Sequence, residues 1–259
     1  MSVLSYLTQR ASGAVLSEDE RSSINTSIST LSTRLDSYFN SPGDGLRNHF
    51  RFGSSMRGTI LPRRIDNNSD IDYMVVFQKG GLTPQAYLDR LRKFVEQKYG
   101  TSEIYQSSPT IVLELNHIRF ELVPALHSYG ETYEIPNGPG AWRNSSPKEF
   151  NDSLEARNGQ EGSMLKPTIR LAKIWNTKNG YVFDTYLFEK WISEQFYFTK
   201  TNQKTYLFTV FDNLVANQAT QWRNDKIARS KEIVSAVRRY EQDEMPASAE
   251  IEVNKLIPE

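Results

Sequence analysis

Two aspartates separated by one residue, Asp70 and Asp72, give the strongest chemical signal in the sequence. They stand at the head of an expected strand, so both carboxylates project from the same face of it. Two carboxylates this close repel each other unless a cation lies between them, and their hard oxygen atoms suit Mg²⁺ or Mn²⁺. The pair therefore indicates a divalent metal site, although Asp70 alone would also fit an ordinary turn residue.

A phosphate-binding turn is the second signal. Gly53 and Ser54 follow a short expected strand around residues 48–52, and Asp70 comes sixteen residues after Ser54. A turn of small residues offers backbone N–H groups and a hydroxyl to a phosphate. The interval is long enough for a loop to return Asp70 to the side of this turn. We interpret the nearby His49 as a satisfied strand histidine, because a two-metal site needs no separate base.

A third carboxylate, Glu121, comes from an expected hairpin within residues 110–123. A two-residue loop places Val112 opposite Glu121 and Glu114 opposite Arg119. Glu114 then has an ion-pair partner, so we interpret it as structural. Two metal ions about 4 Å apart require a third acid, and Glu121 can supply it.

The composition disfavours several other classes of protein. The 259 residues include 31 Lys plus Arg and 31 Asp plus Glu, and this zero net charge disfavours a large constitutive nucleic-acid footprint. The absence of cysteine excludes disulfides, thiolate nucleophiles and Cys-ligated zinc, and fits a reducing compartment. The sequence contains neither a Walker-type loop nor a nucleophile elbow. Because it also lacks a long apolar run and a leader-like start, we expect a cytoplasmic protein without membrane contact.

The first half of the chain mixes helices and strands. Ser17 and Glu20 form an expected capping box, and an apolar stripe that runs to Tyr38 predicts a long helix. A strand is expected over residues 71–77 and a second amphipathic helix around residues 87–99.

The second half has almost no strand signal. Its expected helices are Met164–Trp175, Asp184–Glu194, Tyr206–Val215 and Asn224–Tyr240. The acidic tail over residues 243–259 is expected to pack only in part. This order predicts an α+β fold in which residues 1–150 form a sheet core and residues 151–259 a helical cap.

One expected helix carries a basic stripe. Lys166, Arg170 and Lys173 recur at helical spacing on a segment that is otherwise apolar. A polyphosphate would be a fitting partner for this stripe. The same three cations could instead pair with acids of a neighbouring helix or face solvent.

The combination of Gly53-Ser54, Asp70-x-Asp72 and Glu121 resembles the DNA polymerase β-type nucleotidyltransferase superfamily. Within it, the chain resembles the bacterial cGAS/DncV-like nucleotidyltransferases at three stretches, residues 53–59, 120–125 and 171–176. These enzymes make cyclic oligonucleotide second messengers in anti-phage defence. The resemblance runs from the first expected helix to the end of the helical half. It departs from the family at position 121, where the third acid is commonly Asp.

The resemblance implies a polymerase β-like mixed sheet with an N-terminal spine helix, a C-terminal helical cap and an active site in the cleft between them. Asp70 and Asp72 would hold two Mg²⁺ or Mn²⁺ ions. Glu121 would hold the ion that lowers the pKa of the attacking ribose hydroxyl. All three acids are thus expected as catalytic and metal-binding residues.

The resemblance also assigns nucleotide-binding residues. Gly53 and Ser54 would position the donor triphosphate together with Lys173 and Thr185, which stands where the family has Ser. Tyr186 would stack on the donor base, since stacking tolerates any base. An ordinary aromatic in a helix core is the alternative interpretation of Tyr186.

The implied activity is the joining of NTPs into a cyclic di- or trinucleotide with release of pyrophosphate. The product, rather than the protein, would bind a downstream effector, and a regulatory partner protein would fit such a system. One alternative is a transferase that adds a single nucleotide to an RNA, small-molecule or protein acceptor. Another is a nucleotide sensor that keeps the fold without catalysis.

Overall fold

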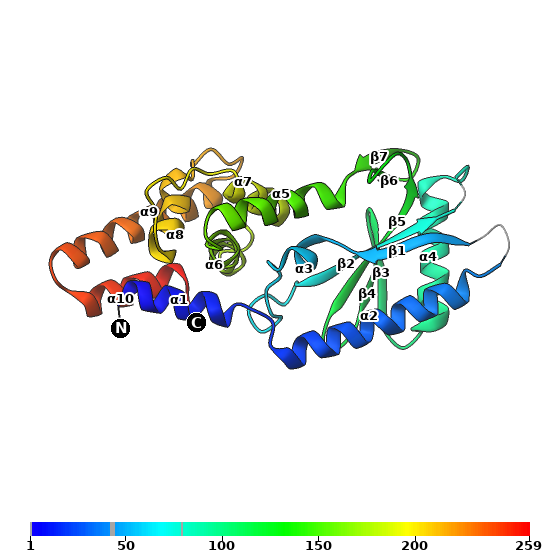
Figure 1. Ribbon diagram of the computed structural model, residues 1–259, viewed down its shortest axis with the longest axis horizontal. Helices are drawn as coiled ribbons and strands as arrows, with labels where there is room; N and C mark the ends of the chain where they lie inside the picture. Colours follow the sequence, from blue (N-terminus) through cyan, green and yellow to red (C-terminus); the bar gives the residue numbers. More distant parts are fainter. Residues whose placement is uncertain (1, 42–44, 79) are drawn as a thin grey trace. The chain divides into compact units, whose positions relative to one another are not determined.

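The computed structural model describes residues 2–41, 45–78 and 80–259, which form two compact units. The sheet unit comprises residues 16–63 and 67–153, and the helical unit comprises residues up to 15, residues 64–66 and residues 154–259 (Figure 1). The division expected at residue 150 therefore differs at the start of the chain, because the first helix packs with the C-terminal helices rather than with the sheet.

Two helices that the sequence did not predict belong to the helical unit. Helix α1 (Val3–Gly13) is capped by Ser2, and the Tyr6 hydroxyl donates a 2.6 Å hydrogen bond to the Ile257 carbonyl. Helix α10 (Pro246–Leu256) buries a stripe formed by Ala249, Glu252, Val253 and Leu256 and packs on α9 (Gln221–Gln242) and α1. The tail is therefore packed only in part, as expected, because this stripe is buried while most of the remaining tail residues are exposed.

The predicted helices of the second half are confirmed to within a few residues. Helix α5 (Pro147–Gln160), which the sequence did not predict, begins in the sheet unit and ends in the helical unit. The helices that follow are α6 (Leu165–Lys178), α7 (Thr185–Ser193), α8 (Gln203–Asn213) and α9 (Gln221–Gln242). Residues 146–259 contain no strand. In the described part of the chain, every helix is too short or too polar to cross a bilayer.

A mixed sheet forms the centre of the sheet unit, as the α+β prediction requires. The strand order is β1-β2-β5-β4-β3, and β6 and β7 extend the sheet from β5. Only β2 and β5 pair in parallel among the described strands. The strands are β1 (Leu46–Arg51), β2 (Asp70–Phe77), β3 (Glu103–Ser107), β4 (Thr110–Glu114), β5 (Arg119–His127), β6 (Tyr133–Pro136) and β7 (Trp142–Ser145).

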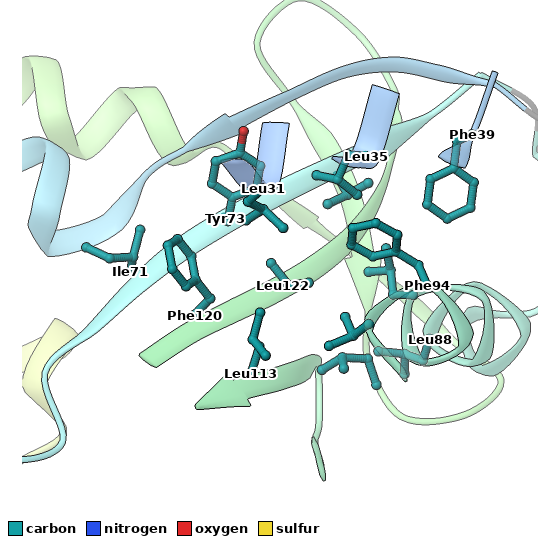
Figure 2. Packing of buried hydrophobic residues seen from close by; sticks show 14 of the residues in the cluster. Leu31, Leu35, Phe39, Ile71, Tyr73, Leu88, Phe94, Leu113, Phe120 and Leu122 are labelled. Carbon is teal, nitrogen blue, oxygen red and sulfur yellow. The ribbon is translucent and has the colours of Figure 1, made fainter. Parts of the chain in front are cut away.

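Helices α2 (Glu18–Tyr38) and α4 (Pro84–Lys98) cover one face of this sheet (Figure 1). The predicted capping box of Ser17 and Glu20 starts α2, with both reciprocal hydrogen bonds present. Alternate strand residues point toward the two helices and form the main apolar core, which includes Leu113, Phe120 and Leu122 (Figure 2). The sheet face that carries this core is therefore closed to ligands.

The opposite face carries a smaller apolar cluster, formed by Met74, Val76, Val123, Ala125, Tyr133 and Ile135. These residues lie toward the carboxyl ends of β2 and β5 and on β6. At the beginning of β2 and β5, the same face turns polar. The functional candidates of the sheet lie on this polar part.

The main core predicts a stability difference between two leucine truncations in the sheet unit. Leu122→Ala removes a side chain that is 0% exposed and should lower the free energy of unfolding by about 2–5 kcal/mol. Leu82→Ala removes one that is 48% exposed and should change it by less than about 0.5 kcal/mol. Urea unfolding of both variants measures the difference. Equal losses would contradict the assigned core.

Candidate functional site

The three acidic candidates share one face of neighbouring strands. In the parallel pairing of β2 and β5, Asp72 lies opposite Glu121 and Asp70 lies opposite Arg119. Residues paired in this way point to the same side of a sheet. All three acids are half-buried, whereas Ile71 between the aspartates is buried on the core face. The predicted juxtaposition of Glu121 with the Asp-x-Asp pair is thus present in the backbone register.

Glu121 lies in an environment that disfavours its charged form. Burial raises the pKa of the Glu121 carboxyl, the nearby Arg119 guanidinium lowers it, and the Glu114 carboxylate raises it further. The net direction is upward, so burial and like charge outweigh the single cation. A divalent cation on this face would relieve the same penalty.

The Gly-Ser turn packs directly against one of the acids. Gly53 begins the short helix α3 (Gly53–Arg57) with φ of +69°, and a Cβ atom at this position would lie 1.7 Å from Asp72 Oδ2. The Phe52 N–H donates a 2.9 Å hydrogen bond to the Asp72 carbonyl. Ser54, which follows, is half-buried. Only glycine therefore allows the turn to approach the carboxylate this closely.

Arg57 fixes α3 from its other end. Its side chain is buried, its Nη1 donates a 3.2 Å hydrogen bond to Asn151 Oδ1, and its Cζ lies 4.8 Å from the centre of the Phe150 ring. Both partners belong to the first turns of α5. The sequence pattern does not predict this role, although Arg57 lies within the stretch that carries the family resemblance.

The donor set of the polar face suits a hard divalent cation, because it consists of carboxylate oxygens. Across residues 2–41, 45–78 and 80–259, no three His, Cys, Asp or Glu side chains gather closely enough to form a finished metal site. The register therefore brings Asp70, Asp72 and Glu121 side by side as backbone positions, without closing their carboxylates around one point. The residues fit a metal by their chemistry and placement.

The remaining nucleotide-binding candidates lie in the helical unit. Lys173 on α6 is 5% exposed, Thr185 begins α7, and Tyr186 is 48% exposed. The alternative interpretation of Tyr186 as a core aromatic is therefore wrong. Asn176 links the two helices, because its side chain makes two 2.9 Å hydrogen bonds to the backbone N–H and carbonyl of Phe183. This role of Asn176 was also not predicted.

The three cations of the basic stripe on α6 differ in their surroundings. Lys166 forms an ion pair with Glu155 of α5, which matches the structural alternative for that residue. Burial lowers the pKa of Arg170. Lys173 is the most buried of the three cations, so the triphosphate hypothesis now depends on it.

The surroundings of His49 agree with its interpretation as a strand histidine whose hydrogen bonds are satisfied. Its Nδ1 lies 2.8 Å from the Tyr73 hydroxyl and its Nε2 lies 2.9 Å from Asp36 Oδ1. Tyr73 belongs to the main apolar core, on the face of β2 opposite the acids. The histidine is thus satisfied within the covered face of the sheet.

Comparison with known proteins finds a family model that covers more than half of the chain. Residues 1–158 match the family model described as Second Messenger Oligonucleotide or Dinucleotide Synthetase domain, or SMODS. A "Probable cyclic nucleotide synthase" from Bacillus cereus strain VD146 is 28% identical over 184 residues, which are 56% of this chain. The match spans 54% of that relative, so the chain accounts for about half of its length.

Solved structures share the fold across most of the chain. CdnC from E. coli MS115-1, solved with ATP, has a TM-score of 0.76 at 16% identity and covers 100% of this chain and 98% of its own. In its HORMA-deltaN complex CdnC gives a TM-score of 0.73 at 16% identity, covering 98% and 96%. Vibrio cholerae DncV cyclic AMP-GMP synthase, solved with a linear intermediate, gives 0.63 at 13% identity, covering 82% and 68%. At these identities the likeness establishes the fold.

Two glycines of the turn provide a matched test of the approach to Asp72. Gly53 and Gly58 have φ of +69° and +71°, so alanine at either position should cost about 1–2 kcal/mol of backbone strain. A Cβ at Gly58 has nothing within 4 Å, whereas one at Gly53 overlaps the Asp72 carboxylate. In a Mn²⁺ titration, Gly53→Ala should therefore also lose Mn²⁺ binding, whereas Gly58→Ala should still bind Mn²⁺. Equal Mn²⁺ binding by both variants would contradict the approach.

The raised pKa of Glu121 predicts a pH-dependent effect of Glu121→Gln in metal-free protein with chelator present. A carboxyl whose folded pKa lies above its unfolded value stabilises the fold below the unfolded pKa and loses this contribution as pH rises through the folded pKa. Glu121→Gln should therefore match wild type in acid and exceed it in unfolding free energy at neutral pH. Urea unfolding of both proteins from acid to neutral pH measures this difference in unfolding free energy. A difference that does not change with pH would contradict the burial of the Glu121 charge.

Proposed function

We propose that this chain, which belongs to the Second Messenger Oligonucleotide or Dinucleotide Synthetase family, joins NTPs into a cyclic di- or trinucleotide and releases pyrophosphate. One observation carries the proposal: the in-register pairing of β2 and β5 that sets Asp72 beside Glu121, with Asp70 on the same face. The Gly53 turn lies against Asp72, where a donor triphosphate would have to reach the acids. The match to a cyclic nucleotide synthase supports the cyclic product.

Asp70, Asp72 and Glu121 would hold two Mg²⁺ or Mn²⁺ ions, which when bound supply charge neutralisation and a more acidic ribose hydroxyl. The chain's own residues position the reactants in line. Ser54 would orient the donor triphosphate from the start of α3. Gly53 keeps the backbone close enough to the acids for that contact.

Lys173, Thr185 and Tyr186 would serve the same nucleotide from the helical unit. Lys173 is a nearly buried cation, and its ammonium group is of the type that binds phosphate. The hydrogen bonds of Asn176 fix the segment that leads into α7, so Thr185 and Tyr186 start from a defined backbone. The exposed ring of Tyr186 suits stacking on a base of any identity. The cleft expected between the two halves stays a prediction.

The partners of the proposed enzyme follow from its relatives. CdnC was solved with ATP and in a complex with HORMA-deltaN, and DncV with a linear intermediate. We therefore propose NTPs, including ATP, as substrates and a regulatory protein as partner. A downstream effector would bind the cyclic product in anti-phage defence. The cysteine-free composition agrees with the proposed cytoplasmic location.

The double variant Asp70→Asn/Asp72→Asn tests the activity. Turnover of the four NTPs with Mg²⁺ or Mn²⁺ should fall by about a thousandfold or more, because the metal-binding charge is removed. Its melting temperature should stay unchanged or rise, since two half-buried like charges are neutralised. Asp89→Asn, on the exposed side of α4, is the matched control and should turn over normally.

Mass spectrometry of the products separates the remaining hypotheses. Phosphatase-resistant nucleotides formed without an added acceptor support the proposal. Strict dependence on an acceptor would identify a single-nucleotide transferase instead. NTP binding without pyrophosphate release under any metal would identify a sensor, and wild-type turnover in the double Asn variant would exclude the proposed site.

A further inference from the structure

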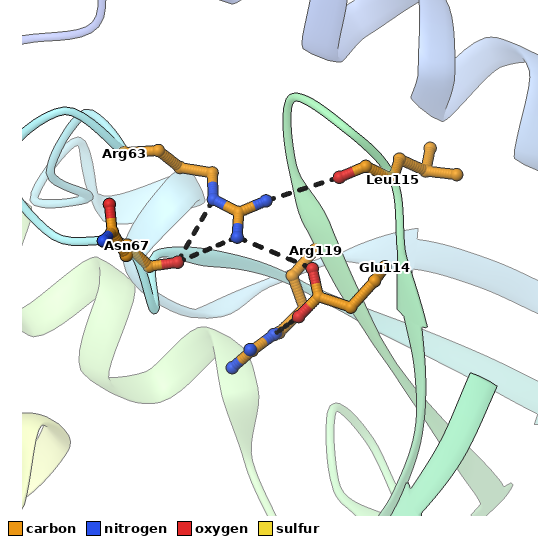
Figure 3. A network of polar contacts seen from close by, with 5 residues as sticks. All are labelled: Arg63, Asn67, Glu114, Leu115 and Arg119. Atoms are coloured by element: carbon orange, nitrogen blue, oxygen red, sulfur yellow. Dashed lines mark hydrogen bonds and ion pairs between the residues drawn. The ribbon is translucent and has the colours of Figure 1, made fainter. Parts of the chain in front are cut away.

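Figure 3 shows a network in which Arg63 and Arg119 both contact Glu114. Arg119 Nε donates a hydrogen bond to Glu114 Oε1, and Arg63 Nη2 lies 3.6 Å from Glu114 Oε2. The three side chains are partly buried, with Glu114 17%, Arg119 20% and Arg63 27% exposed. Each oxygen of Glu114 therefore faces a different guanidinium. This arrangement goes beyond the single ion pair that the hairpin register predicted.

The network borders the acids by strand register. Glu114, Arg119 and Asp70 are consecutive register partners on β4, β5 and β2, so Arg119 lies between Glu114 and Asp70. Glu121 follows Arg119 by two residues on the same strand face. Arg119 is thus a neighbour of two carboxylates proposed to bind metal, and electrostatic interactions link it to both Asp70 and Glu121.

The charge of Arg119 opposes metal binding unless it is held elsewhere. An arginine side chain stays protonated at all accessible pH values, and its planar fork matches a carboxylate well. A guanidinium turned toward Asp70 and Glu121 would neutralise the carboxylates that a divalent cation requires. Glu114 holds Arg119 from the opposite side, toward β4.

Arg63 gives the network a second effect on the site. Its Nε and Nη2 donate hydrogen bonds of 3.1 and 2.9 Å to the Asn67 carbonyl, and its Nη1 donates one of 3.4 Å to the Leu115 carbonyl. Asn67 precedes Asp70 by three residues, and Leu115 begins the β4–β5 turn. Glu114 therefore also contacts Arg63, which links the segment before β2 to the β4–β5 hairpin (Figure 3).

We propose that Glu114 is a positioning residue for the carboxylate site, because it holds Arg119 toward β4 and so limits the competition of this guanidinium with a divalent cation for Asp70 and Glu121. This inference deepens the proposed function and rests on its metal-binding part. Glu114 touches neither metal nor substrate in this account. It acts through Arg119.

Mn²⁺ binding to the full chain without nucleotide, followed by electron paramagnetic resonance at constant pH, tests the inference. Glu114→Gln should weaken Mn²⁺ binding roughly tenfold, because the released Arg119 competes for the acids. Arg119→Gln should leave binding equal or tighter. The double variant Glu114→Gln/Arg119→Gln should bind like Arg119→Gln alone, since Glu114 has no competing charge left to hold. Glu114→Asp, which keeps the charge, should stay close to wild type.

Glu131→Gln is the matched control, because Glu131 forms an exposed ion pair with Lys148 elsewhere in the sheet unit. A purely structural role for Glu114 would lower the melting temperature of Glu114→Gln without changing its Mn²⁺ affinity, and that result overturns the inference. Weaker binding in Arg119→Gln overturns it as well, even if Glu114→Gln fails to fold. Mn²⁺ binding that survives in Asp70→Asn/Asp72→Asn would instead refute the proposed metal site. The product assay tests the proposed activity separately.

Discussion

The in-register parallel pairing of β2 and β5 is the constraint on which the rest of the sheet unit depends. It sends alternate residues to opposite faces, so Ile71, Phe120 and Leu122 enter the core while Asp70 and Glu121 stay on the polar side. A slip of one residue would exchange these faces and bury the acids under α2 and α4. The apolar packing of one face therefore fixes the chemistry of the other.

Several carboxylates lie close together on the polar face, and the residues around them shape their environment. Gly53 lets the backbone approach Asp72, where any side chain would overlap the carboxylate. Arg119 partly compensates Glu121, whose pKa nevertheless stays raised because burial and Glu114 oppose it. Such a face is costly in the metal-free protein and becomes favourable when a divalent cation binds. The cost is the physical reason to regard the site as functional rather than structural.

Local signals in the sequence were sufficient for many elements. The capping box of Ser17, the register of the β4–β5 hairpin and helices α6–α9 follow from spacing of a few residues, and the structure confirms them. Other features depend on contacts distant in sequence. The packing of α1 against the tail and the link between Arg63 and Glu114 leave no local pattern. The roles of the candidate site residues stay predictions, because side chains that meet only around a ligand are not specified by backbone register.

The most direct measurement of the central claim is a crystal structure of the chain with Mn²⁺ and a non-hydrolysable NTP, with the ions located by anomalous scattering. We expect anomalous peaks next to the carboxylates of Asp70, Asp72 and Glu121, with the triphosphate against Gly53 and Ser54. Peaks bound elsewhere, or a Glu121 side chain directed away from ions that the two aspartates hold, would contradict it.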